Sequence, residues 1–126
     1  MKENFLSEQH RERFVLMLEE MGFDDNIDLY WKSLLFIISG NETLCMNRKQ
    51  LINYDERSIN SEKWFDGVFS GGEQRLLGLT YNLFTSLAFY EHEDGRRYYI
   101  SPLDVFSGLD PENYELAKNA LDIRFH

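Results

Sequence analysis

The sequence predicts an all-α fold, a single compact globule of five to six helices that forms one domain over residues 1–126. Apolar residues recur at the i, i+3, i+4, i+7 spacing of helices in most segments, and not in the alternation of strands. The two prolines, Pro102 and Pro111, each follow a residue that commonly caps a helix. A chain of this length can also bury a real core without disulfides or metals.

The first two helices are predicted over residues 7–21 and from residues 24–26 to Gly40. Ser7 can cap the first helix, and Gly22 supplies its C-terminal stop. The second helix is apolar on several sides in its C-terminal half, so we expect that half to be buried all round. Its apolar positions are Ile27, Tyr30, Trp31, Leu34, Leu35 and Ile38, with Phe36 and Ile37 beside them.

Residues 41–66 show the weakest pattern. Leu44, Leu51 and Ile52 predict a short helix over residues 43–53. The stretch from residue 55 to residue 66 is interpreted as a loop.

The central helix of the predicted fold covers about residues 71–89. Ser70 and Glu73 have the spacing of a capping box, in which each side chain accepts a hydrogen bond from the other's backbone amide. The apolar arc is wider than a surface helix needs, which predicts a central position. Its members are Leu76, Leu77, Leu79, Leu83, Phe84, Leu87 and Ala88.

The C-terminal part is predicted to contain at most a very small β element, near residues 97–100, after a turn at Asp94-Gly95. Ser101 and Pro102 then have the pattern of a helix start, and this short helix runs to about Phe106. Asp110 and Pro111 repeat the pattern for the last helix.

The formal net charge of −9 repels phosphate backbones, so we expect no direct binding to nucleic acid. Cys45 is the only cysteine, which excludes an intramolecular disulfide. The longest apolar run, residues 34–38, cannot span a bilayer, and residues 1–10 lack the apolar core of a signal peptide. We therefore expect a cytoplasmic protein without a membrane partner.

Residues 69–75 read FSGGEQR, which resembles the signature loop of ATP-binding cassette proteins. No G-x-x-x-x-G-K-[ST] phosphate loop accompanies it, so the sequence argues against such an ATPase. A narrower hypothesis is a small anionic-ligand or enzymatic site at this helix start, because amides there attract anions. Its residues would be Ser70, Gly71, Gly72, Arg75 and Asn82. The alternative is that these residues cap the helix and brace neighbouring loops.

A second candidate surface is acidic and lies at the first interhelical corner. It consists of Glu19, Glu20, Asp24, Asp25 and Asp28. These acids predict either a solvated corner or a docking face for a basic partner. No ligand spacing for a metal occurs, and no base is indicated beside Cys45, so we expect no catalytic residue, no metal and no cofactor.

Five stretches resemble an uncharacterised family of short proteins from Gram-positive bacteria (Firmicutes) and their phages and mobile elements, a domain of unknown function. They are residues 5–14 (FLSEQHRERF), 32–40 (KSLLFIISG), 82–84 (NLF, together with Arg75), 101–106 (SPLDVF) and 120–125 (ALDIRF). The resemblance implies a bacterial or phage cytoplasmic setting and supplies no activity or catalytic residue. Similar proteins tend to be more basic where this chain has Gly71-Gly72-Glu73.

These observations favour a non-enzymatic protein-interaction or modulator module. Two alternatives stay open. One is the anionic-ligand or enzymatic site at the start of the predicted central helix. The other is an acidic mimic of nucleic acid that inhibits a protein that binds DNA or RNA, which requires the acids to lie on one face.

Overall fold

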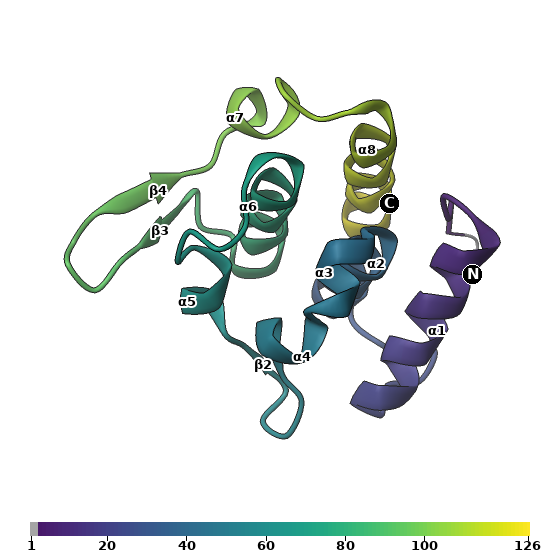
Figure 1. Cartoon of the computed structure of the whole chain (residues 1–126). Coiled ribbons are helices and arrows are strands. Elements are labelled where there is room, and N and C mark those ends of the chain that lie inside the picture. Colours follow the sequence, from purple (N-terminus) through teal and green to yellow (C-terminus); the bar gives the residue numbers. More distant parts are fainter. Residues whose placement is uncertain (1–2) are drawn as a thin grey trace.

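A computed structural model describes residues 3–126, which form eight helices and two small antiparallel hairpins (Figure 1). The long helices are α1 (Glu8–Met21), α2 (Leu29–Gly40), α6 (Gly71–Thr85) and α8 (Pro111–Phe125). The short helices are α3 (Glu42–Met46), α4 (Arg48–Leu51), α5 (Ser61–Trp64) and α7 (Pro102–Phe106). The expectation of a mostly helical chain is confirmed. Five to six helices and a strictly all-α fold are wrong.

Helix α2 is the centre of the fold, and the expectation that residues 71–89 form the central helix is wrong. Residues 33–40 of α2 are all buried, and α1, α3, α6 and α8 pack around them. Figure 1 shows α2 between α1 and α6. Gly40 permits the close approach of α8, because a Cβ atom there would lie 2.3 Å from Cδ1 of Leu116.

Helix α6 ends at Thr85, four residues earlier than expected, because Ser86 adopts a left-handed conformation with φ of 67°. The chain then enters β3 (Phe89–Glu91), which pairs with β4 (Arg97–Tyr99) in the register Tyr90 to Tyr98. This hairpin lies on the far side of α6 from α1 (Figure 1). The β element expected near residues 97–100 is therefore one strand of a hairpin.

The hairpin is fixed to the body by aromatic rings. Tyr90 stacks on Phe65 with ring centroids 4.5 Å apart, and Tyr98 lies 5.1 Å from the same ring. Tyr98 also covers Gly78 of α6, where a Cβ atom would lie 3.4 Å from its ring. The strand β4 is thereby held beside α6.

Residues 41–66 differ most from the prediction. In place of one helix over 43–53 and a loop over 55–66, they form α3, α4, α5 and a hairpin of β1 (Ile52–Asn53) and β2 (Ser58–Ile59). Trp64 is fully buried and its indole Nε1 donates to the carbonyl oxygen of Leu51 at 2.9 Å. This hydrogen bond and the burial of the ring hold the segment against the core.

Candidate functional site

A groove of about 370 Å³ lies between the start of α6, strand β4 and α7. It brings together three of the five residues predicted as a ligand site, Ser70, Gly71 and Arg75. The lining is completed by Gln74, Tyr98, Tyr99 and Asp104. Sequence reasoning missed the contributions of β4 and α7, since only the tertiary fold places these segments beside α6.

Arg75 is braced against one wall of the groove. Its Nη1 atom donates a hydrogen bond to the backbone carbonyl of Asp104. Gly108 lies directly on the guanidinium, where a Cβ atom would lie 2.9 Å from Cζ. Glycine at position 108 therefore allows the chain after α7 to contact the arginine side chain. On the neighbouring wall, burial raises the pKa of the Tyr98 hydroxyl, and the charge of Arg75 opposes this effect.

The predicted capping box at the start of α6 is wrong. Ser70 occupies the cap position, but its side chain makes no capping hydrogen bond. Gly71 has a left-handed backbone with φ of 59°, which departs from the helical geometry that a capping box needs after its first residue. Glu73 instead accepts a hydrogen bond through Oε2 from Nδ2 of Asn41 at 3.0 Å. The first-turn amides of α6 are thus left without a side-chain cap.

Gly72 does not contribute to the groove and faces α8. A Cβ atom at this position would lie 2.7 Å from Nδ2 of Asn113. The Oδ1 atom of Asn113 accepts a hydrogen bond from Asn41 at 3.2 Å. Asn41, Glu73 and Asn113 therefore join the starts of α3, α6 and α8, beside a polar cavity of about 260 Å³. The close neighbour that Gly72 admits is a side chain of the protein itself.

Asn82 lies at the opposite end of α6 from the groove. Its Nδ2 atom donates to the carbonyl oxygen of Leu87 at 2.9 Å, which fixes the turn after the helix. Twelve residues of helical rise separate it from Ser70 by about 18 Å. The structure therefore does not bring Asn82 together with the other predicted site residues.

Three large apolar side chains are exposed at or next to residues that line the groove. Val68, Tyr99 and Leu103 have 75%, 63% and 76% of their surface exposed. Tyr99 lines the groove itself, Val68 precedes Ser70 by two residues, and Leu103 precedes Asp104. None of the three had been identified from the sequence as a site residue.

The acidic corner is less uniform in the structure than in the sequence. Asp28 caps α2 by accepting from the amide of Trp31 at 2.9 Å. Asp24 accepts from the amide of Asn26 at 2.8 Å, and Glu19 and Asp25 are exposed. Two arginines contact this corner: Arg48 donates to the carboxylate of Glu20, and Arg57 donates to the carbonyl oxygen of Gly22. The docking face for a basic partner stays a prediction.

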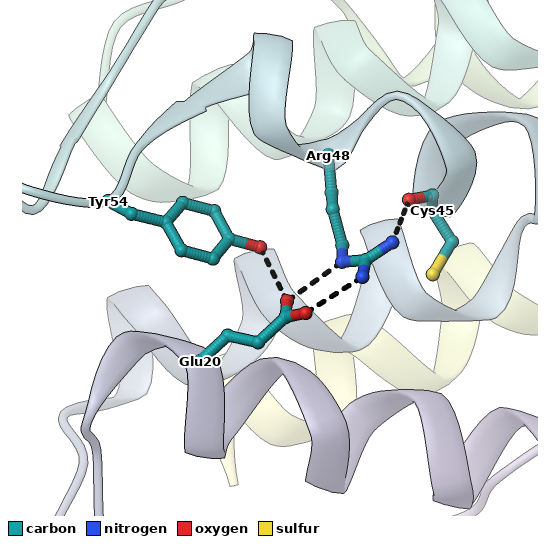
Figure 2. A network of polar contacts seen from close by, with 4 residues as sticks. All are labelled: Glu20, Cys45, Arg48 and Tyr54. Carbon is teal, nitrogen blue, oxygen red and sulfur yellow. Dashed lines mark hydrogen bonds and ion pairs between the residues drawn. The ribbon is translucent and has the colours of Figure 1, made fainter.

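Glu20 is the member of this corner that is paired with a basic side chain and a tyrosine hydroxyl (Figure 2). Arg48 donates to its two carboxylate oxygens from Nε and Nη2, each at 2.8 Å. The Tyr54 hydroxyl donates to Oε1 at 2.9 Å, and Arg48 Nη1 donates to the carbonyl oxygen of Cys45 at 2.9 Å. This polar cluster of Glu20, Arg48 and Tyr54 joins α1 to α3, α4 and the first hairpin.

Electrostatics in the polar cluster favour structure over catalysis. The hydrogen bonds from Arg48 hold the pKa of Glu20 below its ordinary value, against the opposing effect of burial. Burial, and then the hydrogen bond to Glu20, raise the pKa of Tyr54. A carboxylate with a lowered pKa is a weak general base, and a phenol with a raised pKa is a weak acid. The two groups are therefore suited to holding three segments together.

Cys45 is buried, and the described acidic side chains form no metal-binding cluster. Burial raises the pKa of the Cys45 thiol, which keeps it in the unreactive protonated form. Among residues 3–126, no group of three or more His, Cys, Asp or Glu side chains is placed to hold a metal ion. In the same range no helix has both the length and the apolar character needed to cross a membrane.

Comparison with known proteins identifies the family of the chain but assigns it no function. A family model described as "Family of unknown function (DUF6075)" matches residues 1–126. No curated protein and no solved structure matches the chain. The expected membership in a domain family of unknown function is therefore confirmed, and its distribution among Gram-positive bacteria and phages stays a prediction. The chain belongs to the DUF6075 family.

Proposed function

We propose that this protein is a non-enzymatic protein-interaction module that docks a partner on the groove between α6, β4 and α7. The observation that carries the proposal is the exposure of Tyr99, which lines this groove, together with that of Val68 and Leu103, which lie within two residues of lining positions along the chain. Exposed apolar side chains that gather around a concave surface are typical of interaction sites. Arg75 and Asp104 supply polar groups at the centre.

The partner is expected to be apolar at its centre and basic around it. The groove lining carries one basic and one acidic residue, so it has no strong charge of its own. The net charge of −9 on the whole chain attracts a basic partner over a longer range. The exposed acids of the first corner, such as Glu19 and Asp25, belong to that field.

A capture experiment with matched variants tests the proposal. The bait is the full chain, and the lysate is that of a Gram-positive bacterium, the setting that the family resemblance implies. The groove variant combines Val68→Ser, Tyr99→Ser and Leu103→Ser. The control variant combines Met46→Ser and Phe125→Ser, whose side chains are exposed to a similar degree, 75% and 62%. We expect a protein that is captured by the wild type and the control and lost by the groove variant. Equal capture by all three, or none above background, contradicts the proposal.

A small anionic ligand at the start of α6 is the second candidate function. It is favoured by the missing side-chain cap at Ser70, which leaves the first-turn amides without a side-chain partner, and by Arg75, which lines the same groove as Ser70 and Gly71. An enzymatic role would require a catalytic group in addition, and the one carboxylate of the lining, Asp104, already accepts a hydrogen bond from the Ser101 hydroxyl at 2.8 Å.

Thermal unfolding in the presence of nucleotides and phosphorylated metabolites separates the two candidates. A ligand site predicts a rise in melting temperature that Arg75→Ala abolishes and Arg97→Ala retains, since Arg97 is a hairpin arginine paired with Glu91 outside the groove lining. The absence of any shift removes the ligand hypothesis and leaves protein docking.

Mimicry of a nucleic acid receives no supporting observation. Six acids in the described range form ion pairs with basic side chains, among them Glu91 with Arg97 and Glu115 with Lys118. The exposed acids are spread over α1, α5, the β3–β4 hairpin and α8. A mimic needs a single acidic face, so this hypothesis ranks third.

A further inference from the structure

The N-terminal strap, defined here as residues 3–6, lies across three helices. The ring of Phe5 packs on His10 of α1 and Phe36 of α2, with centroids 5.0 Å and 5.6 Å away. The carbonyl oxygen of Asn4 accepts from Nδ2 of Asn119 in α8 at 2.9 Å. Glu3 forms an ion pair with Lys32 of α2 at 2.7 Å, and both side chains are almost fully buried. The strap therefore depends on a small number of specific contacts.

His10 is the contact that can change its protonation near neutral pH. It is 1% exposed, and both ring nitrogens have partners. Nδ1 accepts from the backbone amide of Leu6 at 3.1 Å, and Nε2 lies 2.9 Å from the carbonyl oxygen of Phe36. An amide only donates and a carbonyl only accepts, so these partners require a neutral imidazole with its hydrogen on Nε2.

We propose that His10 is a proton-operated latch, and that protonation of its Nδ1 atom releases the strap from α1, α2 and α8. When Nδ1 of His10 is protonated, it becomes an N–H donor that faces the N–H donor of Leu6. Two donors cannot form a hydrogen bond, so this contact is lost. The hydrogen bond from Nε2 to Phe36 survives, so the ring stays on α2, while the strap loses its hydrogen bond to α1 and is left with its contacts through Glu3, Asn4 and Phe5. No comparable change occurs within α1 or α2, because their backbone hydrogen bonds do not involve the imidazole.

The polar cavity of about 260 Å³ gives solvent protons a route to the ring, because His10 and Leu6 both line it. Helix α2 presents no charged group to His10 and contributes the carbonyl of Phe36 and the backbone of Gly40. The charged side chains that line the cavity from the other elements are Arg13 of α1, Glu42 of α3, Glu73 of α6, and Asp110 and Glu112 at the start of α8.

The surroundings of His10 determine whether the strap is closed at neutral or at acidic pH. Burial lowers the pKa of His10, the hydrogen bond to Phe36 opposes this, and Arg13 lowers it further. The strap is therefore closed at neutral pH and opens as the pH falls below the ordinary histidine value. The four carboxylates of the cavity favour the charged ring once the strap has opened and water has entered. Opening also uncovers the aromatic surface of Phe14 and Phe36, both buried beneath Phe5 in the closed form.

Amide hydrogen exchange of the full chain, read residue by residue by NMR, tests the latch. Between about pH 7.5 and about pH 5.5, we expect the protection factor of the Leu6 amide to fall by about tenfold or more, after correction for the intrinsic rate. The amides of Leu35 and Phe36 should keep their protection. The midpoint of the fall should coincide with the titration of the His10 imidazole nitrogens in the same sample.

Two variants complete the experiment. His10→Gln cannot be protonated in this range, so its Leu6 protection should not depend on pH, whereas His92→Gln should behave as the wild type. The latch is overturned by pH-independent protection of Leu6 in the wild type, by a parallel loss in α2, or by a pH dependence that survives in His10→Gln. If His10→Gln does not fold, the comparison of the two midpoints in the wild type decides, and midpoints that differ overturn the latch.

Discussion

Arg48 binds Glu20 through two parallel hydrogen bonds, and each side chain retains about a fifth of its surface exposed, 20% and 19%. Removal of one partner leaves the other charge partly buried without its counterpart. We expect Arg48→Met to lower the free energy of unfolding by about 1–3 kcal/mol, as measured by urea denaturation. The matched control is Arg11→Met, which removes an exposed pair with Glu8 and should change stability much less than Arg48→Met does. Equal effects of the two variants contradict a structural role for the polar cluster.

The effect of Gly72→Ala on stability should change sign when the neighbouring side chain of Asn113 is removed. Alanine normally stabilises a helix relative to glycine by up to about 1 kcal/mol. A Cβ atom at position 72 would lie 2.7 Å from Asn113, which is tied to Asn41, so Gly72→Ala should destabilise the wild type by about 1–2 kcal/mol. In the Asn113→Ala background the same change should be neutral or stabilising. Additive effects in this double-mutant cycle, read from denaturation curves, refute the contact.

Two helix caps should contribute differently to the stability of the fold. Ser70 makes no capping hydrogen bond, whereas Asp28 accepts one from the amide of Trp31. Ser70→Ala should therefore change the free energy of unfolding by only a few tenths of a kcal/mol, and Asp28→Ala should lower it by about 1 kcal/mol. Thermal denaturation of the two variants side by side checks this. A loss of about 1 kcal/mol in Ser70→Ala would show that the Ser70 side chain does cap α6, contrary to the structure.

The sequence correctly predicts those helix starts that depend only on residues close along the chain. The caps at Ser7, Ser101 and Asp110 are confirmed, because each side chain accepts from an amide three residues further on and needs no tertiary partner. The start of α2 was placed too early, since several acids and amides before Asp28 could equally serve as a cap. The wide apolar arc assigned to residues 71–89 included Leu87 and Ala88, which follow the helix end and are exposed.

Other features depend on contacts that no local pattern records. The β1–β2 hairpin has Arg57 at a φ of 51° in its turn, a position where glycine or asparagine would have been the expected signal. Of the candidate site, the sequence indicated Ser70, Gly71 and Arg75, and it could not indicate Tyr99 or Leu103. Tyr99 lines the groove because the β3–β4 hairpin packs beside α6, and Leu103 lies next to the lining residue Asp104 because α7 follows β4.

The pH dependence of stability belongs to the whole molecule. The pKa of Glu20 is lowered in the folded state from an ordinary value of 4.5. Its contribution to stability is therefore present above that value and is lost as the pH falls through the folded value. Glu20→Gln should be less stable than the wild type at neutral pH, and the difference should shrink below about pH 4.5. Urea denaturation at a series of pH values measures this, and a constant difference contradicts the assignment.

The central position of α2 has a consequence for the synthesis of the chain. A ribosome makes residues 29–40 soon after α1, whereas α6 and α8, which cover the other sides of α2, are made later. Until residues 111–125 emerge, the apolar residues 34–38 lack part of their cover. The core around α2 can therefore be completed only after α8 has been made, and a chain that stalls before α8 would be prone to aggregation or to capture by chaperones.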